Sequence, residues 1–232
     1  MTRRIAVYGG SFNPFGNNHL DVIRYLAESG EFSQIILVPS VAHALKADQF
    51  PYEHRFNMTE LGVTARYHAV PSFPEKVTIG VSLAEMQMLK RQPGPIYTYH
   101  LLQYLQKEHA QFDGEVGYRF VIGPDILDEI DQWKYVDEIR KDFGFFEVPE
   151  MGLHMSQVRD MIGNGVSTWK QHVPHVVANY IKMHGLYHVE RVDCVHELHE
   201  KLKRHSRDPF DPPRDICSKC GLERLHHLKK PA

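Results

Sequence analysis

Cysteine is scarce in this sequence, with three residues among 232, and an odd number does not form a disulfide framework. No run of about 18 apolar residues occurs, which argues against a membrane-spanning helix. The start of the chain lacks the long apolar region and cleavage site of a signal peptide. The formal net charge of −2 gives no excess of positive charge for nucleic acid or an anionic membrane. We therefore expect a cytoplasmic protein without membrane or nucleic-acid partners.

Short apolar runs alternate with amphipathic stretches over most of the chain. β-Branched and aromatic content predicts strands at 4–10, 34–40, 118–127 and 144–150, and a strand followed by a loop at 77–86. Apolar residues at helical spacing predict helices at 19–30, 52–66, 97–110, 136–143, 155–165 and 173–187. This alternation predicts an α/β protein with a Rossmann-like, doubly wound parallel sheet that is covered on both faces.

Ligands of such folds bind beyond the carboxyl ends of the strands, at the point where the strand order reverses. Three turns follow predicted strands, at 9–19, 39–46 and 123–125. In the first turn, Gly9 and Gly10 allow a sharp bend and a close approach to phosphate. The helix predicted to start near His19 directs free N–H groups at the same point. The turn matches neither G-x-G-x-x-G nor the Walker P-loop, so an ordinary strand–helix turn remains an alternative.

Six motifs, in chain order, resemble those of the nicotinate and nicotinamide mononucleotide adenylyltransferases, which are nucleotidyltransferases related to class I tRNA synthetases. The first is GGSFNPFGNNHL at 9–20, which resembles the family's G-G-[ST]-F-[DN]-P-x-H-x-G-H. The others are PSVAHALKADQFPYEHRFNMTEL at 39–61, YTYHLL at 97–102, VIGPDILDEIDQWKYVDEI at 121–139, LHMSQVRDMI at 153–162 and VPHVVANYIKMHGLY at 173–187. The resemblance covers residues 3–188.

The resemblance implies an enzyme of NAD biosynthesis that joins ATP to a pyridine mononucleotide and releases pyrophosphate. The acceptor phosphate attacks the α-phosphorus of ATP, so the protein has to position the reactants and stabilise negative charge rather than supply a nucleophile. Mg²⁺ is expected with the triphosphate, held mostly by phosphate oxygens and water. The choice between nicotinate and nicotinamide and the oligomeric state stay open.

The same resemblance implies the site residues. The catalytic residues would be His19, Lys46 and Arg159. The ATP site would comprise Gly9, Gly10, Ser11, Phe12, Gly16, His19, Gly123, Asp125, Ser156 and Arg159, with Arg159 in the first turn of a helix. The mononucleotide site would comprise Lys46, Arg55, Thr98 and Trp133, with Thr98 also a possible helix N-cap. Each has an ordinary structural alternative: His19 as a helix cap, Asp125 as a turn residue, Trp133 as a core residue and the cations as surface charges.

One position departs from the family pattern in a way that affects function. The family's H-x-G-H is Gly16-Asn17-Asn18-His19 here, so the first histidine is absent. Losing one charge-stabilising donor typically costs on the order of 10²–10³ in rate. Asn17, Asn18 or His154 could compensate. We expect a working, divergent enzyme; the alternatives are a weakened nucleotide-binding or regulatory protein, or a nucleotidyltransferase with another acceptor such as phosphopantetheine.

The composition changes after residue 190, and we expect a nucleotidyltransferase domain at 1–190 followed by an extension at 191–232. The extension is rich in His, Lys, Arg and Pro and contains Cys217-x-x-Cys220 followed by glycine. Cys217, Cys220, His226 and His205 form a candidate structural zinc site, because such a short segment gains folding energy from a metal. The alternative is a flexible tail with reduced thiols.

Overall fold

The computed structural model describes residues 3–41, 49–69, 77–110 and 116–188. By the clustering of contacts, the chain divides into two compact units at 1–178 and 179–232, whereas the sequence suggested a division at residue 190. The extension at 191–232 lies outside the described residues. Within the described ranges, no helix is long and apolar enough to cross a membrane.

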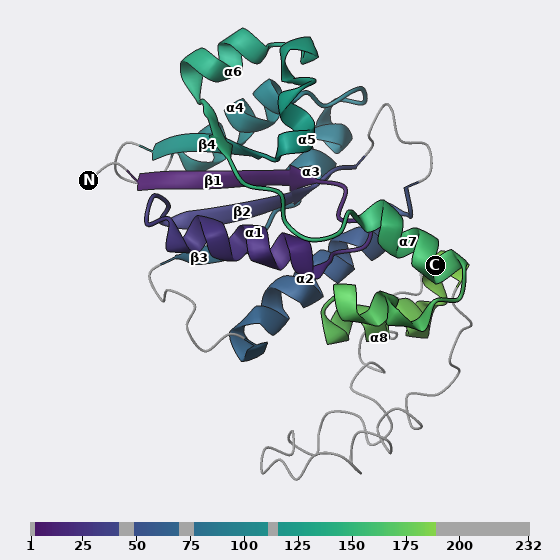
Figure 1. The fold of residues 1–232 in the computed structure, drawn as a ribbon. Helices are drawn as coiled ribbons and strands as arrows, with labels where there is room; N and C mark the ends of the chain where they lie inside the picture. Colours follow the sequence, from purple (N-terminus) through teal and green to yellow (C-terminus); the bar gives the residue numbers. More distant parts are fainter. Residues whose placement is uncertain (1–2, 42–48, 70–76, 111–115, 189–232) are drawn as a thin grey trace, which may run out of the picture. The chain divides into compact units, whose positions relative to one another are not determined.

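A five-stranded parallel sheet forms the centre of the first unit, in the order β3-β2-β1-β4-β5 (Figure 1). The strands are β1 (Arg3–Gly10), β2 (Gln34–Pro39), β3 (Thr78–Val81), β4 (Val116–Ile122) and β5 (Phe145–Glu147). In β2 every residue after the first is buried, as expected of a strand covered on both faces. The predicted parallel α/β sheet is therefore confirmed.

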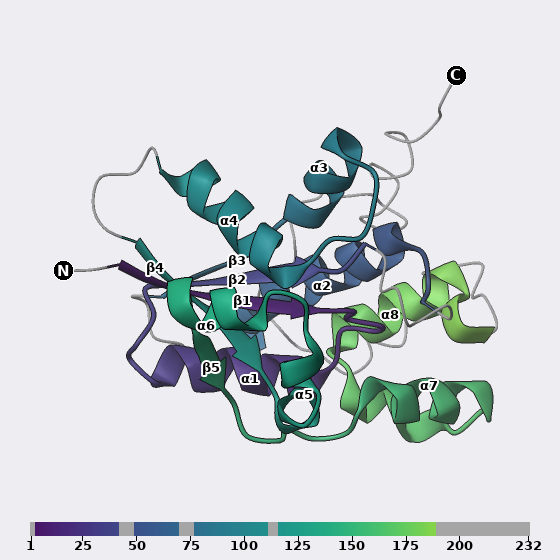
Figure 2. The same ribbon diagram turned by 90° about the horizontal axis from the view of Figure 1, so that it is seen from above.

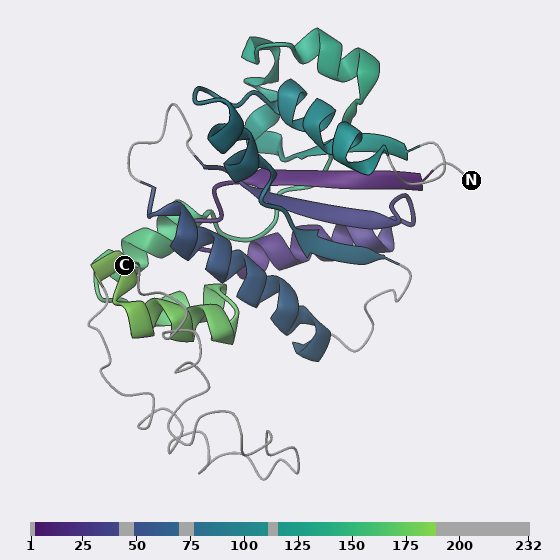
Figure 3. The same ribbon diagram turned by 180° about the vertical axis from the view of Figure 1, so that it is seen from behind.

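Helices lie on both faces of this sheet. Figure 2 shows α1 on one face and α3 and α4 on the other, and Figure 3 shows α3 and α4 from behind. The helices are α1 (Asn17–Glu28), α2 (Tyr52–Ala69), α3 (Ala84–Arg91), α4 (Thr98–His109), α5 (Pro124–Leu127), α6 (Val136–Asp142), α7 (Met155–Gly163) and α8 (His175–His184). Short 3₁₀ helices are η1 (Ile130–Gln132), η2 (Ser167–His172) and η3 (Leu186–His188).

Two expected boundaries differ from the structure. The strand predicted at 118–127 ends at Ile122, because Pro124 starts α5 and proline suits the first position of a helix. The loop expected within 77–86 is short, and Ala84 already begins the helix α3. With only eight residues, α3 is shorter than the window of about 11–18 residues over which helical periodicity can be recognised.

The strand order indicates where in the sheet the candidate site lies. β1 lies between β2 and β4, so the chain leaves β1 in one direction toward β2 and later returns to its other side through β4. In the parallel register Gly10 pairs with Pro39, and Val7 pairs with Phe120. The turns after β1 and β4 therefore meet at one edge, at the switch point of the sheet. The third predicted turn is described only to residue 41.

Candidate functional site

The turn between β1 and α1 is closely packed. A Cβ atom on Gly9 would lie 2.8 Å from Cζ of Phe120, and one on Gly10 would lie 3.2 Å from Cζ of Phe12. Phe12 itself is buried and has a φ of +46°. Both glycines thus have a packing role that the sequence pattern did not reveal, in addition to the predicted approach to phosphate.

His19 accepts a hydrogen bond at the start of α1 and keeps one ring N–H group free to donate. Its Nδ1 accepts a hydrogen bond of 2.9 Å from the backbone N–H of Gly16, the N-cap of α1. The proton of the neutral ring is therefore on Nε2, which has no hydrogen-bond partner among the described residues. Burial beside the rings of Phe12 and Phe15, whose centroids lie 5.0 and 5.2 Å away, lowers the pKa of His19 to about 3. At neutral pH His19 offers a neutral N–H donor rather than a positive charge.

The two asparagines at the start of α1 are both engaged. Asn17 Nδ2 donates a hydrogen bond of 2.9 Å to the backbone oxygen of Gln171, which connects the start of α1 to η2. Asn18 Oδ1 accepts a hydrogen bond of 2.8 Å from the backbone N–H of His19. Both asparagines are candidates for replacing the family's first histidine. The amide of Asn18 donates no hydrogen bond to the described residues, whereas the amide of Asn17 already donates one.

A side chain at position 16 would require the side chains of Met155 and Asn18 to move. A Cβ atom there would lie 2.4 Å from Sδ of Met155 and 2.7 Å from Oδ1 of Asn18. The backbone of Gly16 is extended, with a φ of −116°, so its conformation is open to any residue and only the packing restricts the position. The end of the Met155 side chain thus occupies the volume that a side chain at position 16 would enter.

The helix α7 carries Ser156 and Arg159 to the same end of the sheet. Ser156 is its second residue and is exposed. Arg159 is its fifth residue, one position beyond the first turn expected from the sequence. Arg159 Nη1 donates a hydrogen bond of 2.7 Å to the backbone oxygen of Asn13, which ties α7 to the β1–α1 turn. The remaining nitrogens of Arg159 make no hydrogen bond to the described residues, so they remain available for an anion.

Arg55 has a different environment from that expected of a ligand contact. Its side chain is 1% exposed and donates three hydrogen bonds to backbone oxygens. Nε binds Phe50 at 2.8 Å, Nη1 binds Ser11 at 2.7 Å and Nη2 binds Ser40 at 2.7 Å. Arg55 therefore fixes the segments after β1 and β2 and before α2, and this geometry favours a positioning role over the predicted contact with the mononucleotide.

The turn after β4 approaches the end of β1, as expected from the topology. Gly123 is the N-cap of α5, and a Cβ there would lie 2.8 Å from Oδ1 of Asp125. Burial, with a smaller effect of the Asp125 carboxylate, raises the pKa of Tyr8 in β1. Asp125 is exposed and lies three residues beyond the end of β4, the strand that pairs with β1.

Trp133 and the start of α4 form a second group of predicted site residues. Tyr97 is the N-cap of α4, so Thr98 is the first helical residue rather than the cap. Tyr97 lies 5.7 Å from Tyr135 between ring centroids, which brings the start of α4 close to the segment after Trp133. Trp133 is half-buried and contacts Phe120 edge-on at 5.9 Å. Lys134 Nζ lies 4.5 Å from the ring centroid of Tyr97.

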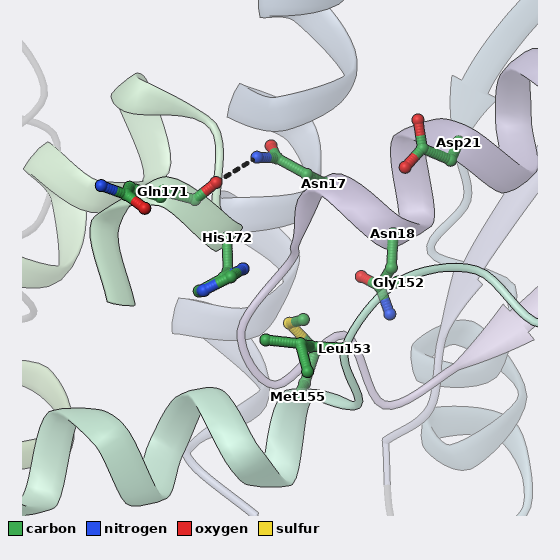
Figure 4. A pocket seen from close by; sticks show the side chains of 8 residues that line it. All are labelled: Asn17, Asn18, Asp21, Gly152, Leu153, Met155, Gln171 and His172. Atoms are coloured by element: carbon green, nitrogen blue, oxygen red, sulfur yellow. Dashed lines mark hydrogen bonds between the residues drawn. The ribbon is translucent and has the colours of Figure 1, made fainter. Parts of the chain in front are cut away.

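A hollow of about 170 Å³ lies beside the start of α1 (Figure 4). Residues of α1, of the segment before α7 and of η2 line it: Asn17, Asn18, Asp21, Gly152, Leu153, Met155, Gln171 and His172. His154, the histidine that the sequence suggested as a compensating group, is absent from this lining. It is exposed, and its Nε2 lies 3.5 Å from Glu150. Sequence reasoning missed His172, because only the folded chain brings η2 to α1.

Some predicted residues cannot be placed. Lys46 lies outside the described residues, as do Cys217, Cys220, His205 and His226. Among the residues that the structure does describe, no cluster of three or more His, Cys, Asp or Glu side chains could hold a metal ion. The predicted roles of these five residues stay predictions.

Comparison with known proteins identifies relatives that match most of the chain. A protein of Leifsonia xyli named "Probable nicotinate-nucleotide adenylyltransferase" is 27% identical over 206 residues, which cover 79% of this chain and 94% of the relative. A protein of the same name from Streptococcus pyogenes is 28% identical over 205 residues, with 80% and 89% coverage.

The fold also matches solved structures. Nicotinic acid mononucleotide adenylyltransferase of Plasmodium falciparum, complexed with NaAD, superimposes with a TM-score of 0.60 at 18% identity and covers 81% of this chain and 98% of that one. Its complex with APC gives a TM-score of 0.58 at 17% identity, with the same coverage. The family model described as cytidylyltransferase-like matches residues 7–183. The chain therefore belongs to the cytidylyltransferase-like family.

Proposed function

We propose that this protein is an adenylyltransferase of NAD biosynthesis that joins ATP to nicotinate mononucleotide and releases pyrophosphate. The match of named nicotinate-nucleotide adenylyltransferases along about four-fifths of the chain carries this proposal. The meeting of the β1–α1 turn, the start of α7 and the β4–α5 turn at one edge of the sheet supports it, because these three segments contain the predicted ATP residues.

In the proposed reaction, an oxygen of the acceptor phosphate forms a bond to the α-phosphorus of ATP. The bond from that phosphorus to the β-phosphate oxygen breaks, and pyrophosphate leaves. His19 donates its Nε2–H to a phosphate oxygen, and Arg159 and the N-terminus of α7 bind the leaving pyrophosphate. Arg55 keeps the segments around this site in place. Catalysis then comes from positioning and from stabilising charge.

Mg²⁺ accompanies the triphosphate in this proposal. Phosphate oxygens and water would coordinate most of this ion. The ion would neutralise part of the charge on the phosphates. No residue of this chain is assigned as its ligand.

Lys134 favours nicotinate over nicotinamide as the acceptor. Its ammonium group is held over the rings of Tyr97, at 4.5 Å, and Tyr135, at 5.2 Å. It directly follows Trp133, the predicted flat contact for the pyridine ring. A cation beside that ring attracts the carboxylate of nicotinate and has no such attraction for the neutral amide.

The test measures pyrophosphate release and dinucleotide formation with ATP and Mg²⁺, and with nicotinate mononucleotide, nicotinamide mononucleotide or phosphopantetheine. The proposal predicts turnover with the first acceptor. Turnover with phosphopantetheine alone would reassign the acceptor. Binding of ATP without turnover would support the second candidate, a weakened nucleotide-binding protein, which the absence of a histidine at position 16 favours.

For the extension at 191–232 we propose a structural zinc site formed by Cys217, Cys220, His226 and His205, on the basis of the C-x-x-C-G pattern. Metal analysis of the purified protein should give one zinc per chain. Cys217→Ser should remove that zinc and leave adenylyl transfer by residues 1–190 intact. A metal content unaffected by Cys217→Ser would contradict the proposal. A cytoplasmic location is likewise proposed.

A further inference from the structure

We propose that His172 supplies the imidazole that the family pattern has at position 16, and that it binds the phosphates of ATP in the hollow beside α1. This inference rests on the proposed function and identifies a further catalytic residue for it. The family pattern that residues 9–20 resemble has two histidines at the start of this helix, and this chain has only His19 there. The question is which other group in the folded chain faces the volume that the lost side chain would have entered.

The direction of a side chain at position 16 can be derived from the backbone. Its Cβ would fall 2.4 Å from Sδ and 2.6 Å from Cε of Met155. Met155 in turn lines the hollow (Figure 4). A side chain at position 16 would therefore point toward the hollow, and Met155 now occupies its path.

His172 faces the same hollow from the opposite wall. Figure 4 shows its imidazole ring pointing from η2 into the space between Asn17 and Leu153. The position is held firmly, since Trp169 and Val173 on either side of it in the chain are 4% and 3% exposed. The hydrogen bond from Asn17 to the backbone oxygen of the neighbouring Gln171 fixes this segment against α1. The ring itself has no hydrogen-bond partner among the described residues.

The other polar groups of the hollow leave this role to His172. Asn17 uses one amide N–H to hold Gln171. Asn18 keeps its amide N–H groups, but an amide cannot take up the positive charge that an imidazole can carry. Asp21 contributes a negative charge, but its carboxylate lies across the hollow from His172 in Figure 4 and 3.6 Å from Nη1 of Arg24. An anion beside His172 thus avoids the one carboxylate of the lining.

The experiment removes the imidazole from position 172 and introduces one at position 16. His172→Gln is compared with the wild type, with His175→Gln as the control, because His175 is an exposed histidine that is not in the hollow. The third variant carries Gly16→His, Met155→Ser and His172→Gln together, which opens the volume at position 16 and places the imidazole there. The readouts are the affinity for ATP with Mg²⁺, the rate of dinucleotide formation and the melting temperature.

The proposal predicts that His172→Gln weakens ATP binding about tenfold and slows turnover about 10²-fold, with an unchanged melting temperature. The triple variant should regain at least tenfold in rate, and His175→Gln should behave as the wild type. Unchanged ATP affinity in His172→Gln would overturn the inference. So would a loss that the triple variant, folded, does not reverse. If the wild type turns over no acceptor, the proposed function fails, and the ATP affinities alone decide the role of His172.

Discussion

Sδ of Met155 lies 2.4 Å from the point where a Cβ on Gly16 would stand, so the two residues share one volume at the junction of α1 and α7. The space available at position 16 therefore depends on the conformation of the Met155 side chain.

Gly16→Ala should lower the free energy of unfolding by about 1 kcal/mol, the low end of the cost of overpacking, because the atoms in its way are the far ends of the Met155 and Asn18 side chains. Gly163→Ala in α7 is the matched control, since a Cβ there meets no atom within 4 Å and should stabilise the helix by about 0.5–1 kcal/mol. Urea denaturation measures both. The pair Gly16→Ala and Met155→Ala should be less destabilised than the sum of the single variants. Additive effects would show that the two sites are not coupled.

The pH dependence of stability should report the burial of His19. Its pKa falls from the usual 6.5 to about 3 in the folded protein, so below about pH 6.5 the unfolded chain binds a proton that the folded protein does not. The contribution of neutral His19 to the free energy of unfolding is therefore fully present above pH 6.5. It decreases as the pH falls toward 3, by up to about 1.4 kcal/mol per pH unit. His19→Gln lacks this titration, so denaturation at pH 7, 6 and 5 should show a shallower decline. Equal slopes for the variant and the wild type would contradict the assignment.

Arg55 should be more important for stability than its polar character suggests. Arg55→Lys replaces the fork that donates to three backbone oxygens with a single ammonium group. We expect a loss of at least about 2 kcal/mol, because hydrogen bonds to charged groups contribute about 1.5–3 kcal/mol each. Arg91→Lys, at an exposed site 3.9 Å from Glu108, should change stability by less than about 0.5 kcal/mol. A similar small effect at Arg55 would refute its positioning role.

Lys134→Met should alter the choice of acceptor. Loss of the ammonium group should reduce kcat/KM for nicotinate mononucleotide by about tenfold and leave that for nicotinamide mononucleotide nearly unchanged. Lys141→Met, at an exposed position in α6, serves as the control. A parallel decrease with both acceptors in Lys134→Met would indicate a structural role instead.

The sequence predicted the sheet and most helices because their apolar patterns are strong. β2 is buried after its first residue, β1 and β4 bury their central or final residues and contain β-branched and aromatic side chains, and α1 and α4 each bury one face. Helix α3 was not predicted because its eight residues are too few for a helical period to stand out, and only Ala84 among them is buried. Periodicity reports burial, so an element that buries little leaves little signal.

The candidate site could be predicted only where it is local in the chain. The turn holding Gly16 and His19 could be recognised from its motif, but its coupling to Met155 depends on a contact between residues 139 positions apart. The same holds for His172, which reaches the hollow through the packing of η2. For Arg55 the motif was recognised, but the role of the side chain was not evident from it. The motif suggested a ligand contact, whereas the side chain donates hydrogen bonds to three backbone oxygens.

The most direct test of the account is the formation of a dinucleotide and pyrophosphate from ATP, Mg²⁺ and nicotinate mononucleotide by the purified wild-type protein. The account predicts stoichiometric amounts of both products, and a rate on nicotinate mononucleotide that exceeds the rate on nicotinamide mononucleotide. Binding of ATP without product from any of the three acceptors would contradict it and would identify a site that binds nucleotides but no longer catalyses their transfer.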